Sequence, residues 1–170
     1  MLRQLLNLRK LVILAFAAGV LISPVVHAED PGGAIHFDII GLQDDKTYDG
    51  LPVCKIEFSL NNQSTGSIYS ISVRVDVWDD RGDQMEPQLG SIVLSTDEFW
   101  SGSDIVIPQG ETVNILQQRG AKGRCKYLSE VAVTGVDPKN CNIRNLPEEA
   151  NCLEMVRLTS SVESVKIRPR

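Results

Sequence analysis

The sequence predicts an all-β fold: a Greek-key β-sandwich of seven or eight short strands, with one possible short helix near the C-terminus. Apolar and polar residues alternate with a period of two over several runs, which is typical of strands with one buried face. Clusters of Gly, Pro, Asn, Asp and Ser separate these runs. All four cysteines follow residue 28, and an even number of cysteines favours disulfides that would stabilise such a sandwich.

The first 28 residues, 1–28, have the pattern of a signal peptide. Three basic residues precede an apolar run of 13 residues at 11–23, and small residues precede a cleavage site after Ala28. A transmembrane anchor is the alternative, but a membrane-spanning helix needs about 20 apolar residues. We therefore expect a cleaved signal peptide, a secreted or periplasmic protein, and no stable membrane anchor after cleavage.

Residues 29–170 have the length of a single domain. The leader contains three of the 17 Lys and Arg residues and none of the 22 Asp and Glu residues, which leaves a formal net charge of −8 on the rest. An acidic surface disfavours binding to nucleic acids and to anionic membranes. His36 is the one histidine that cleavage would leave, so we expect no metal or other cofactor.

Three alternating runs predict the first strands, at 34–40, 53–60 and 71–77. In each run every second residue is apolar and is expected to face the core, while the residues between face solvent. Such alternation favours antiparallel pairing, because buried parallel strands are apolar on both faces. The residues expected to face the core are Ile35, Phe37, Ile39, Cys54, Ile56, Phe58, Leu60, Ile71, Val73, Val75 and Val77.

Shorter apolar runs predict further strands, at about 89–95, 105–107, 112–117, 127–136 and 162–167. The segment 145–158 differs from these, because Asn145, Pro147 and two early glutamates are typical of a helix start. We predict a short helix there, in which Leu153, Val156 and Met155 are the candidates to face inward.

The predicted strand order also bears on the cysteine pairing. In an immunoglobulin-like sandwich, the second strand and the strand that begins near residue 125 run in the same direction in opposite sheets. Cys54 and Cys125 begin these strands, the latter in phase with Tyr127, and both would point into the core. Four cysteines allow three pairings. We favour Cys54–Cys125 between the sheets and Cys141–Cys152 before the last strand.

Three motifs follow one another between residues 54 and 117: SLNNQS, ISVRVDVWDDRGD and IPQGETVNI. They resemble the Asn-x-Ser, the V-x-V-x-V-x-D-x-x-G hairpin and the P-G-[EQ]-T turn of small immunoglobulin-like modules of FxLYD type and related water-stress domains. The last turn carries one extra residue here, at 108–112. The resemblance covers less than half of residues 29–170. It implies an extracytoplasmic β-sandwich without catalysis.

Arg81-Gly82-Asp83 is the tripeptide that many adhesive proteins present to integrins. A tight turn at 79–82 explains the same residues, because Gly permits a positive φ and Asp binds the local backbone, and we favour the turn. Nearby aspartates could hold calcium, but their spacing misses the D-x-[DN]-x-[DN]-G loop, which favours a solvated turn. These aspartates are Asp76, Asp79, Asp80 and Asp83.

Two segments and one strand residue could contact a protein partner. Residues 117–126 gather basic side chains around two glycines, although a flexible charged loop explains them as well. Residues 97–104 carry two aromatic side chains that either plug the end of the sandwich or contact a partner. Trp78 has an outward position and is expected to cover the outer face or an edge of a sheet. The candidate contact residues are Trp78, Phe99, Trp100, Arg119, Lys122 and Arg124.

These features favour an exported, non-enzymatic interaction or structural module with a protein partner that the sequence does not identify. No G-x-S-x-G, H-E-x-x-H or P-loop motif occurs. One alternative is a periplasmic chaperone or assembly factor that offers an edge strand to a client. Another is a small hydrolase whose two carboxylates are brought together by folding. Asn62-Gln63-Ser64 is a glycosylation sequon only in a eukaryotic source.

Overall fold

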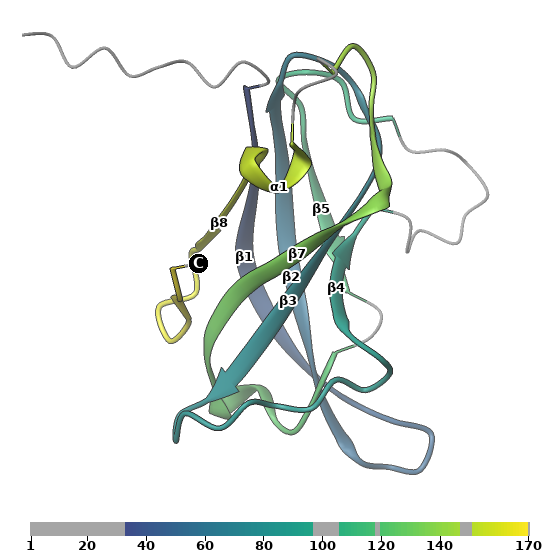
Figure 1. The fold of residues 1–170 in the computed structure, drawn as a ribbon. Helices are drawn as coiled ribbons and strands as arrows, with labels where there is room; N and C mark the ends of the chain where they lie inside the picture. The colour runs from purple at the N-terminus through teal and green to yellow at the C-terminus, as the bar shows by residue number, and fades with distance from the viewer. Residues whose placement is uncertain (1–32, 97–105, 118–119, 147–150, 170) are drawn as a thin grey trace, which may run out of the picture.

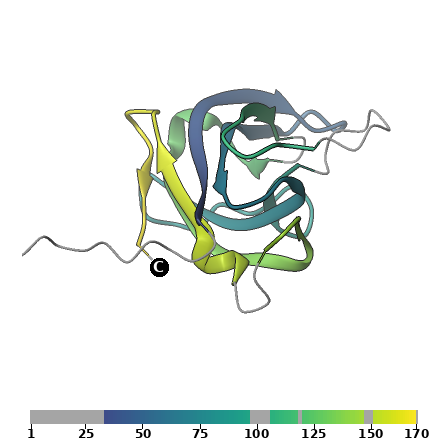
Figure 2. The ribbon, with the colours of Figure 1, turned by 90° about the horizontal axis from the view of Figure 1, so that it is seen from above.

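The computed structural model describes residues 33–96, 106–117, 120–146 and 151–169. These residues form two facing β-sheets, which confirms the predicted sandwich (Figures 1 and 2). No helix among them is long and apolar enough to cross a membrane. Their nine strands are β1 (Gly33–Lys46), β2 (Pro52–Ser64), β3 (Ile68–Asp79), β4 (Ile92–Ser95), β5 (Thr112–Leu116), β6 (Ala121–Lys122), β7 (Leu128–Ile143), β8 (Val156–Ser160) and β9 (Lys166–Ile167).

The chain crosses between the two sheets more than once, as in an immunoglobulin-like Greek-key sandwich. One sheet has the order β5-β2-β1-β8, with β6 paired to the start of β2, and the other has the order β4-β3-β7-β9. β2 and β3 therefore lie in opposite sheets, as do β4 and β5. The described residues form more strands than predicted, because the short strand β6 was not expected and the C-terminal segment joins both sheets.

The core lies between the sheets and consists of the residues that alternation placed inward. All eleven predicted core positions of β1, β2 and β3 are at most 1% exposed. Phe37 and Phe58 meet across neighbouring strands with ring centroids 5.5 Å apart. Burying one such side chain stabilises the fold by about 1.5–3 kcal/mol, so this set dominates the stability. Ser72 was expected to face solvent but is buried, since its hydroxyl lies 2.7 Å from that of Ser95 on β4.

The C-terminal segment departs from the expected antiparallel pairing. β8 pairs parallel with β1, and β9 pairs parallel with β7. The turn between β8 and β9 carries the chain from the edge of one sheet to the edge of the other. Asp38 on β1 fixes this turn, because its carboxylate accepts hydrogen bonds from the hydroxyls of Thr159 and Ser161. Alternation reports which face is buried and says nothing about strand direction, so it could not predict this pairing.

The helix predicted at 145–158 is wrong in its extent. Among the described residues of that segment, only α1 (Cys152–Met155) is helical, and the Asn151 side chain caps its N-terminus. The chain then continues as β8 because pairing with β1 buries Val156, which was correctly expected to face inward. The strand predicted at 162–167 is likewise reduced to the two residues of β9.

Two other predicted strands are also shorter than expected. The run at 89–95 forms a strand only at Ile92–Ser95, which is β4. At 105–107, residue 105 lies outside the described residues, and Ile107 forms a single bridge with Ile68.

Both disulfides pair as favoured, with Cα–Cα distances of 4.7 Å for Cys54–Cys125 and 6.6 Å for Cys141–Cys152. The first joins β2 to the segment before β7, across the two sheets. Cys125 lies in a 3₁₀ turn and not in a strand, so the predicted inward phase of Tyr127 is wrong, and that side chain is 42% exposed. Two disulfides indicate an oxidising, extracytoplasmic environment.

Candidate interaction surface at the hairpin end

The hairpin end of the sandwich, defined here as residues 46–52, 79–91 and 120–127, lies where β1 turns into β2 (Figure 1). Backbone hydrogen bonds tie its three segments together. The N–H of Gln88 donates to the Gly120 carbonyl at 2.9 Å, and the N–H of Gly123 donates to the Pro52 carbonyl at 2.8 Å. Side chains displayed here are therefore held in fixed relative positions.

The tip of the β1–β2 hairpin displays two apolar side chains. Thr47 closes the tip: its carbonyl accepts from the N–H of Gly50 at 2.9 Å, and its hydroxyl accepts from the N–H of Leu51 at 3.0 Å. Gly50 has a φ of 82°, which glycine adopts without strain. Tyr48 is fully exposed and Leu51 is 53% exposed. The closed turn therefore presents both side chains to solvent.

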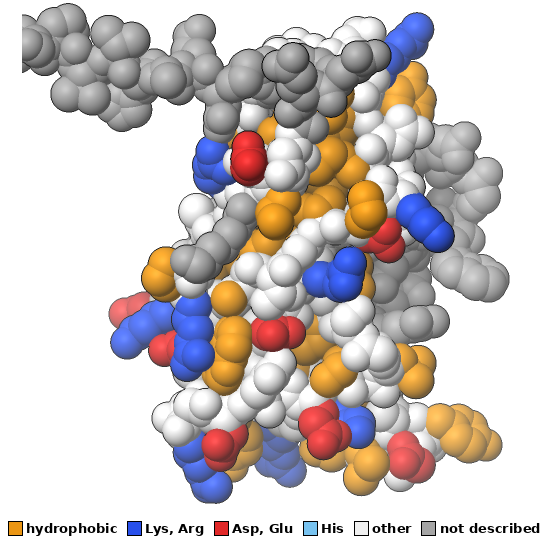
Figure 3. Space-filling model, viewed as in Figure 1, with side chains coloured by type: hydrophobic (Ala, Val, Ile, Leu, Met, Phe, Trp, Pro, Cys, Tyr) orange, Lys and Arg blue, Asp and Glu red, His pale blue; other side chains and the backbone are white. Residues whose placement is uncertain are grey.

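A hollow of about 620 Å³ separates this tip from the 79–91 segment. Leu89, which is 57% exposed, lines it opposite Tyr48 and Leu51, and Lys122 and Gly123 complete the wall. Figure 3 shows hydrophobic side chains protruding at the lower right, where Figure 1 places the hairpin. Large exposed apolar side chains around a concave surface are typical of interaction sites.

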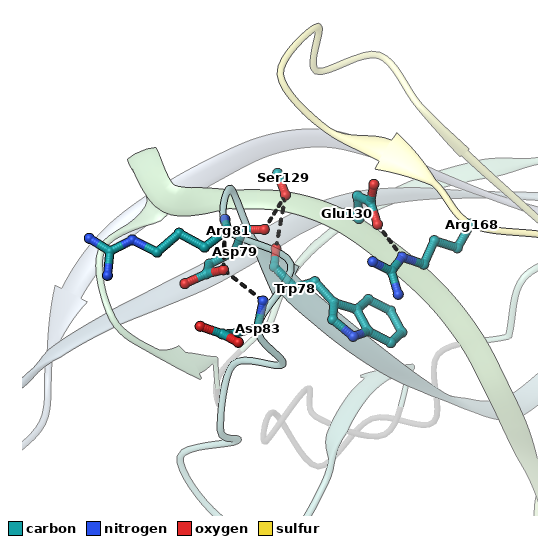
Figure 4. A network of polar contacts seen from close by, with 7 residues as sticks. All are labelled: Trp78, Asp79, Arg81, Asp83, Ser129, Glu130 and Arg168. Carbon is teal, nitrogen blue, oxygen red and sulfur yellow. Dashed lines mark hydrogen bonds and ion pairs between the residues drawn. The ribbon is translucent and has the colours of Figure 1, made fainter.

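The turn at Arg81-Gly82-Asp83 has the geometry predicted for it. The Asp79 carboxylate accepts the N–H groups of Arg81 and Asp83, each at 2.9 Å, and Gly82 has a φ of 86° (Figure 4). Asp79 and Gly82 thus build the turn, while the side chains of Arg81 and Asp83 are exposed. Asp80 is exposed beside them. In the described part of the chain, no three His, Cys, Asp or Glu side chains converge as metal ligands would.

Two ion pairs lie near the hairpin end, and Lys122, which lines the hollow, belongs to one of them. Lys122 Nζ lies 2.8 Å from Glu86 Oε2, and this hydrogen bond lowers the pKa of Glu86 below its ordinary value. Lys55 Nζ lies 2.5 Å from Asp45 Oδ2 and lowers the pKa of that carboxyl in the same way. The surface therefore combines exposed apolar side chains with an ion-paired lysine, and protein interfaces commonly combine an apolar centre with a polar rim.

The structure does not describe all of the predicted contact residues. Lys122 and Arg124 lie at the hairpin end, whereas Phe99, Trp100 and Arg119 fall outside the described residues.

Trp78 lies on the outer face of the second sheet, as its outward position predicts. The Arg168 guanidinium stacks 4.1 Å from its ring centroid and pairs with Glu130 (Figure 4). This stack places the protein's own C-terminal segment against one face of the tryptophan, which stays partly exposed, and its role as a contact residue remains a prediction.

Sequence reasoning did not single out Tyr48, Leu51 and Leu89, the exposed apolar side chains that line the hollow. The stretch DKTYDGLP carried a usable signal, because a tyrosine and a leucine flank Asp49-Gly50 inside a turn between two strands. An apolar side chain in a tight hairpin turn has no sheet to pack against. Leu89 carried no comparable signal, since its exposure depends on how the 79–91 segment folds back.

Comparisons with known proteins return no match: no family model, no curated protein and no solved structure is similar enough to the chain. The resemblance to FxLYD-type modules therefore rests on the three sequence motifs and on the two-sheet sandwich.

Proposed function

We propose that this protein is an exported, non-enzymatic interaction module that binds a protein partner through its hairpin end. The observation that supports this most directly is the exposure of Tyr48, Leu51 and Leu89 around one hollow. Tyrosine is enriched among the residues that contribute most to interface affinity. Because the hairpin turn is closed by its own hydrogen bonds, binding would order few additional groups, which favours affinity.

The charged groups at this end favour binding over catalysis. The hydrolase alternative needs a carboxyl group whose pKa is raised enough for it to act as an acid. At the hairpin end, Lys122 lowers the pKa of Glu86, and the Asp79 carboxylate is occupied by two backbone N–H groups. These carboxylates act as structural groups.

The test is capture of a partner from the envelope or secreted fraction of the source cells. Tyr48→Ser combined with Leu51→Ser should abolish capture, because both changes remove apolar area from the hairpin tip. Leu116→Ser is the matched control: Leu116 is 41% exposed on β5, away from the hairpin end, and should leave capture unchanged. Equal capture by the unchanged protein, the double variant and the control variant would exclude the hairpin end as the contact surface.

A further inference from the structure

The two disulfides of this protein differ in burial. Cys54 is fully buried and Cys125 is 8% exposed, so the bond between them lies inside the sandwich. Cys141 and Cys152 are each partly exposed, and both line a hollow of about 480 Å³. A thiolate in solution can therefore approach the second bond in the folded protein, whereas it reaches the first bond only when the sheets separate.

The hollow lies where β7 bulges beside α1. Figure 2 shows α1, in yellow, next to the green end of β7. In the ladder between β7 and β3, residues 137–140 all fall opposite Ser72, and this extra length leaves the ladder as a bulge. Pro138 of the bulge and Leu153 of α1 both line the hollow. The disulfide joins these two elements at the hollow between them.

Each of these cysteines is also held by contacts other than the disulfide. Cys141 belongs to the ladder between β7 and β3, where it pairs with Ile71. Cys152 begins α1, and the Asn151 side chain caps the start of that helix. Met155, at the end of α1, is 3% exposed and packs in the core. Breaking the bond should therefore leave the two thiols close together, so that the bond can form again.

We propose that Cys141–Cys152 is a site of reversible thiol–disulfide exchange in the folded protein, reached through this hollow by the thiols of a partner. The partner's thiolate attacks one cysteine sulfur, which forms a mixed disulfide and releases the other cysteine as a thiolate. A second thiolate of the partner then attacks the partner's sulfur in that mixed disulfide and releases the first cysteine. Two electrons and two protons thus pass from the partner's thiols, which become a disulfide, to the two cysteine sulfurs.

This site is separate from the hairpin end, and the proposal does not depend on the function proposed above. The thiols that reach it could belong to a small molecule or to the reduced C-x-x-C pair of an oxidoreductase. Both sources carry out the same chemistry, and the experiments below distinguish them.

Dithiothreitol is the first probe, and Cys54–Cys125 is the internal control. The oxidised protein is incubated with dithiothreitol without denaturant at about pH 8, where an ordinary thiol is partly ionised. Alkylation with N-ethylmaleimide and peptide mapping then read each cysteine separately. Cys141 and Cys152 should be alkylated at least tenfold faster than the other pair, at a rate proportional to the dithiothreitol concentration. Equal rates for the two bonds, or a rate that does not depend on concentration, would overturn the proposal, because reduction would then require unfolding.

A substitution in the hollow tests whether access sets this rate. Leu146 lines the hollow and is partly exposed, so Leu146→Trp should fill part of the hollow and slow reduction of Cys141–Cys152 at least fivefold. Leu116→Trp makes the same change at an exposed position on β5 and should leave the rate within twofold. An unchanged rate in both variants would contradict the proposal, since the hollow would not be the route of attack.

Two further reagents identify the source of the thiols. Reduced glutathione should give a mixed disulfide at Cys141 or Cys152 if small thiols react there, which mass spectrometry detects. A protein of the thioredoxin fold with a reduced C-x-x-C pair should reduce the bond faster than an equal concentration of dithiothreitol if an oxidoreductase is the partner. Reaction with neither reagent would overturn the proposal. Oxidised glutathione should then restore Cys141–Cys152 in the reduced protein, and a different cysteine pairing would show that the site is not reversible.

Discussion

The two ends of the sandwich differ in which side chains they bury and which they expose to solvent. At the crossover end, defined as residues 61–68 and 106–111, the polar side chain of Asn62 is fully buried. Its amide nitrogen donates to the carbonyls of Gly66 and Ile107, each at 2.8 Å, and its oxygen accepts from the N–H and hydroxyl of Ser64. At the hairpin end, the exposed side chains of Tyr48, Leu51 and Leu89 surround a hollow, whereas the crossover end exposes one large apolar side chain, Val106.

This contrast separates residues that maintain the fold from residues that are available for contacts. Most buried polar groups in proteins are hydrogen-bonded, as the side chain of Asn62 is. Exposed Tyr48 and Leu51 contribute little to stability and remain available to a partner. The comparison also explains the Asn-x-Ser motif, because the sequon asparagine connects the 61–68 and 106–111 segments and is inaccessible in the folded protein.

The largest expected effect concerns the disulfide nearest the hairpin end. Replacing Cys54 and Cys125 by Ala should lower the free energy of unfolding by about 4 kcal/mol, because the closed loop is long. Replacing Cys141 and Cys152 should cost about 3 kcal/mol, since that loop spans 11 residues. Urea unfolding of the two double variants measures both. A larger loss for the second pair would mean that the crossover end depends on its disulfide more than loop length explains.

Asn62→Ala tests the crossover end directly. It would remove four hydrogen bonds made by a fully buried side chain, and each such bond contributes about 0.5–1.5 kcal/mol. We expect a loss of about 3 kcal/mol in urea unfolding. Asn61→Ala is the neighbouring control, because its amide donates only to the Thr112 hydroxyl at an exposed position, and it should cost less than about 1 kcal/mol. Similar losses of stability for the two variants would show that the burial of the Asn62 hydrogen bonds does not determine their contribution.

Trp78→Ala should lower stability by about 1–2 kcal/mol, because the Arg168 stack and its cover over the sheet are lost. Tyr127→Ala is the matched change at the hairpin end, where Lys126 lies 4.6 Å from an exposed ring, and should cost less than about 0.5 kcal/mol. Thermal unfolding of the two variants measures the difference. If Trp78→Ala is as mild as the control, the Arg168 stack contributes little to holding the C-terminal segment on the second sheet.

The smallest effect is at the ion pair on the hairpin end. Lys122→Ala should raise the pKa of Glu86 toward its ordinary value of 4.5, because the hydrogen bond that favours the carboxylate is removed. In the unchanged protein the Lys122–Glu86 pair stabilises the fold above pH 4.5. This stabilisation is lost as the pH falls through the pKa of Glu86 in the folded state, which lies below 4.5. An NMR titration of the Glu86 carboxyl reads both values. Identical values in the two proteins would mean that the pair does not persist in solution.

The sequence by itself determined the core face of β1, β2 and β3 and favoured the correct cysteine pairing. Strand side chains alternate with a period of two, so a run such as 71–77 shows its buried side without reference to neighbours. The turn at 79–82 was also predictable, because Gly82 and Asp79 act through local backbone conformation and local hydrogen bonds.

Only the tertiary structure decided the remaining features. β8 pairs parallel with β1, Ser72 is buried against Ser95, and Arg168 covers Trp78 because segments distant in sequence meet there. The difference in burial between the two disulfides has the same origin, since it depends on how the sheets and α1 pack around each bond. Burial and charge at such places depend on which distant segment packs against them, and the local sequence pattern does not identify that segment.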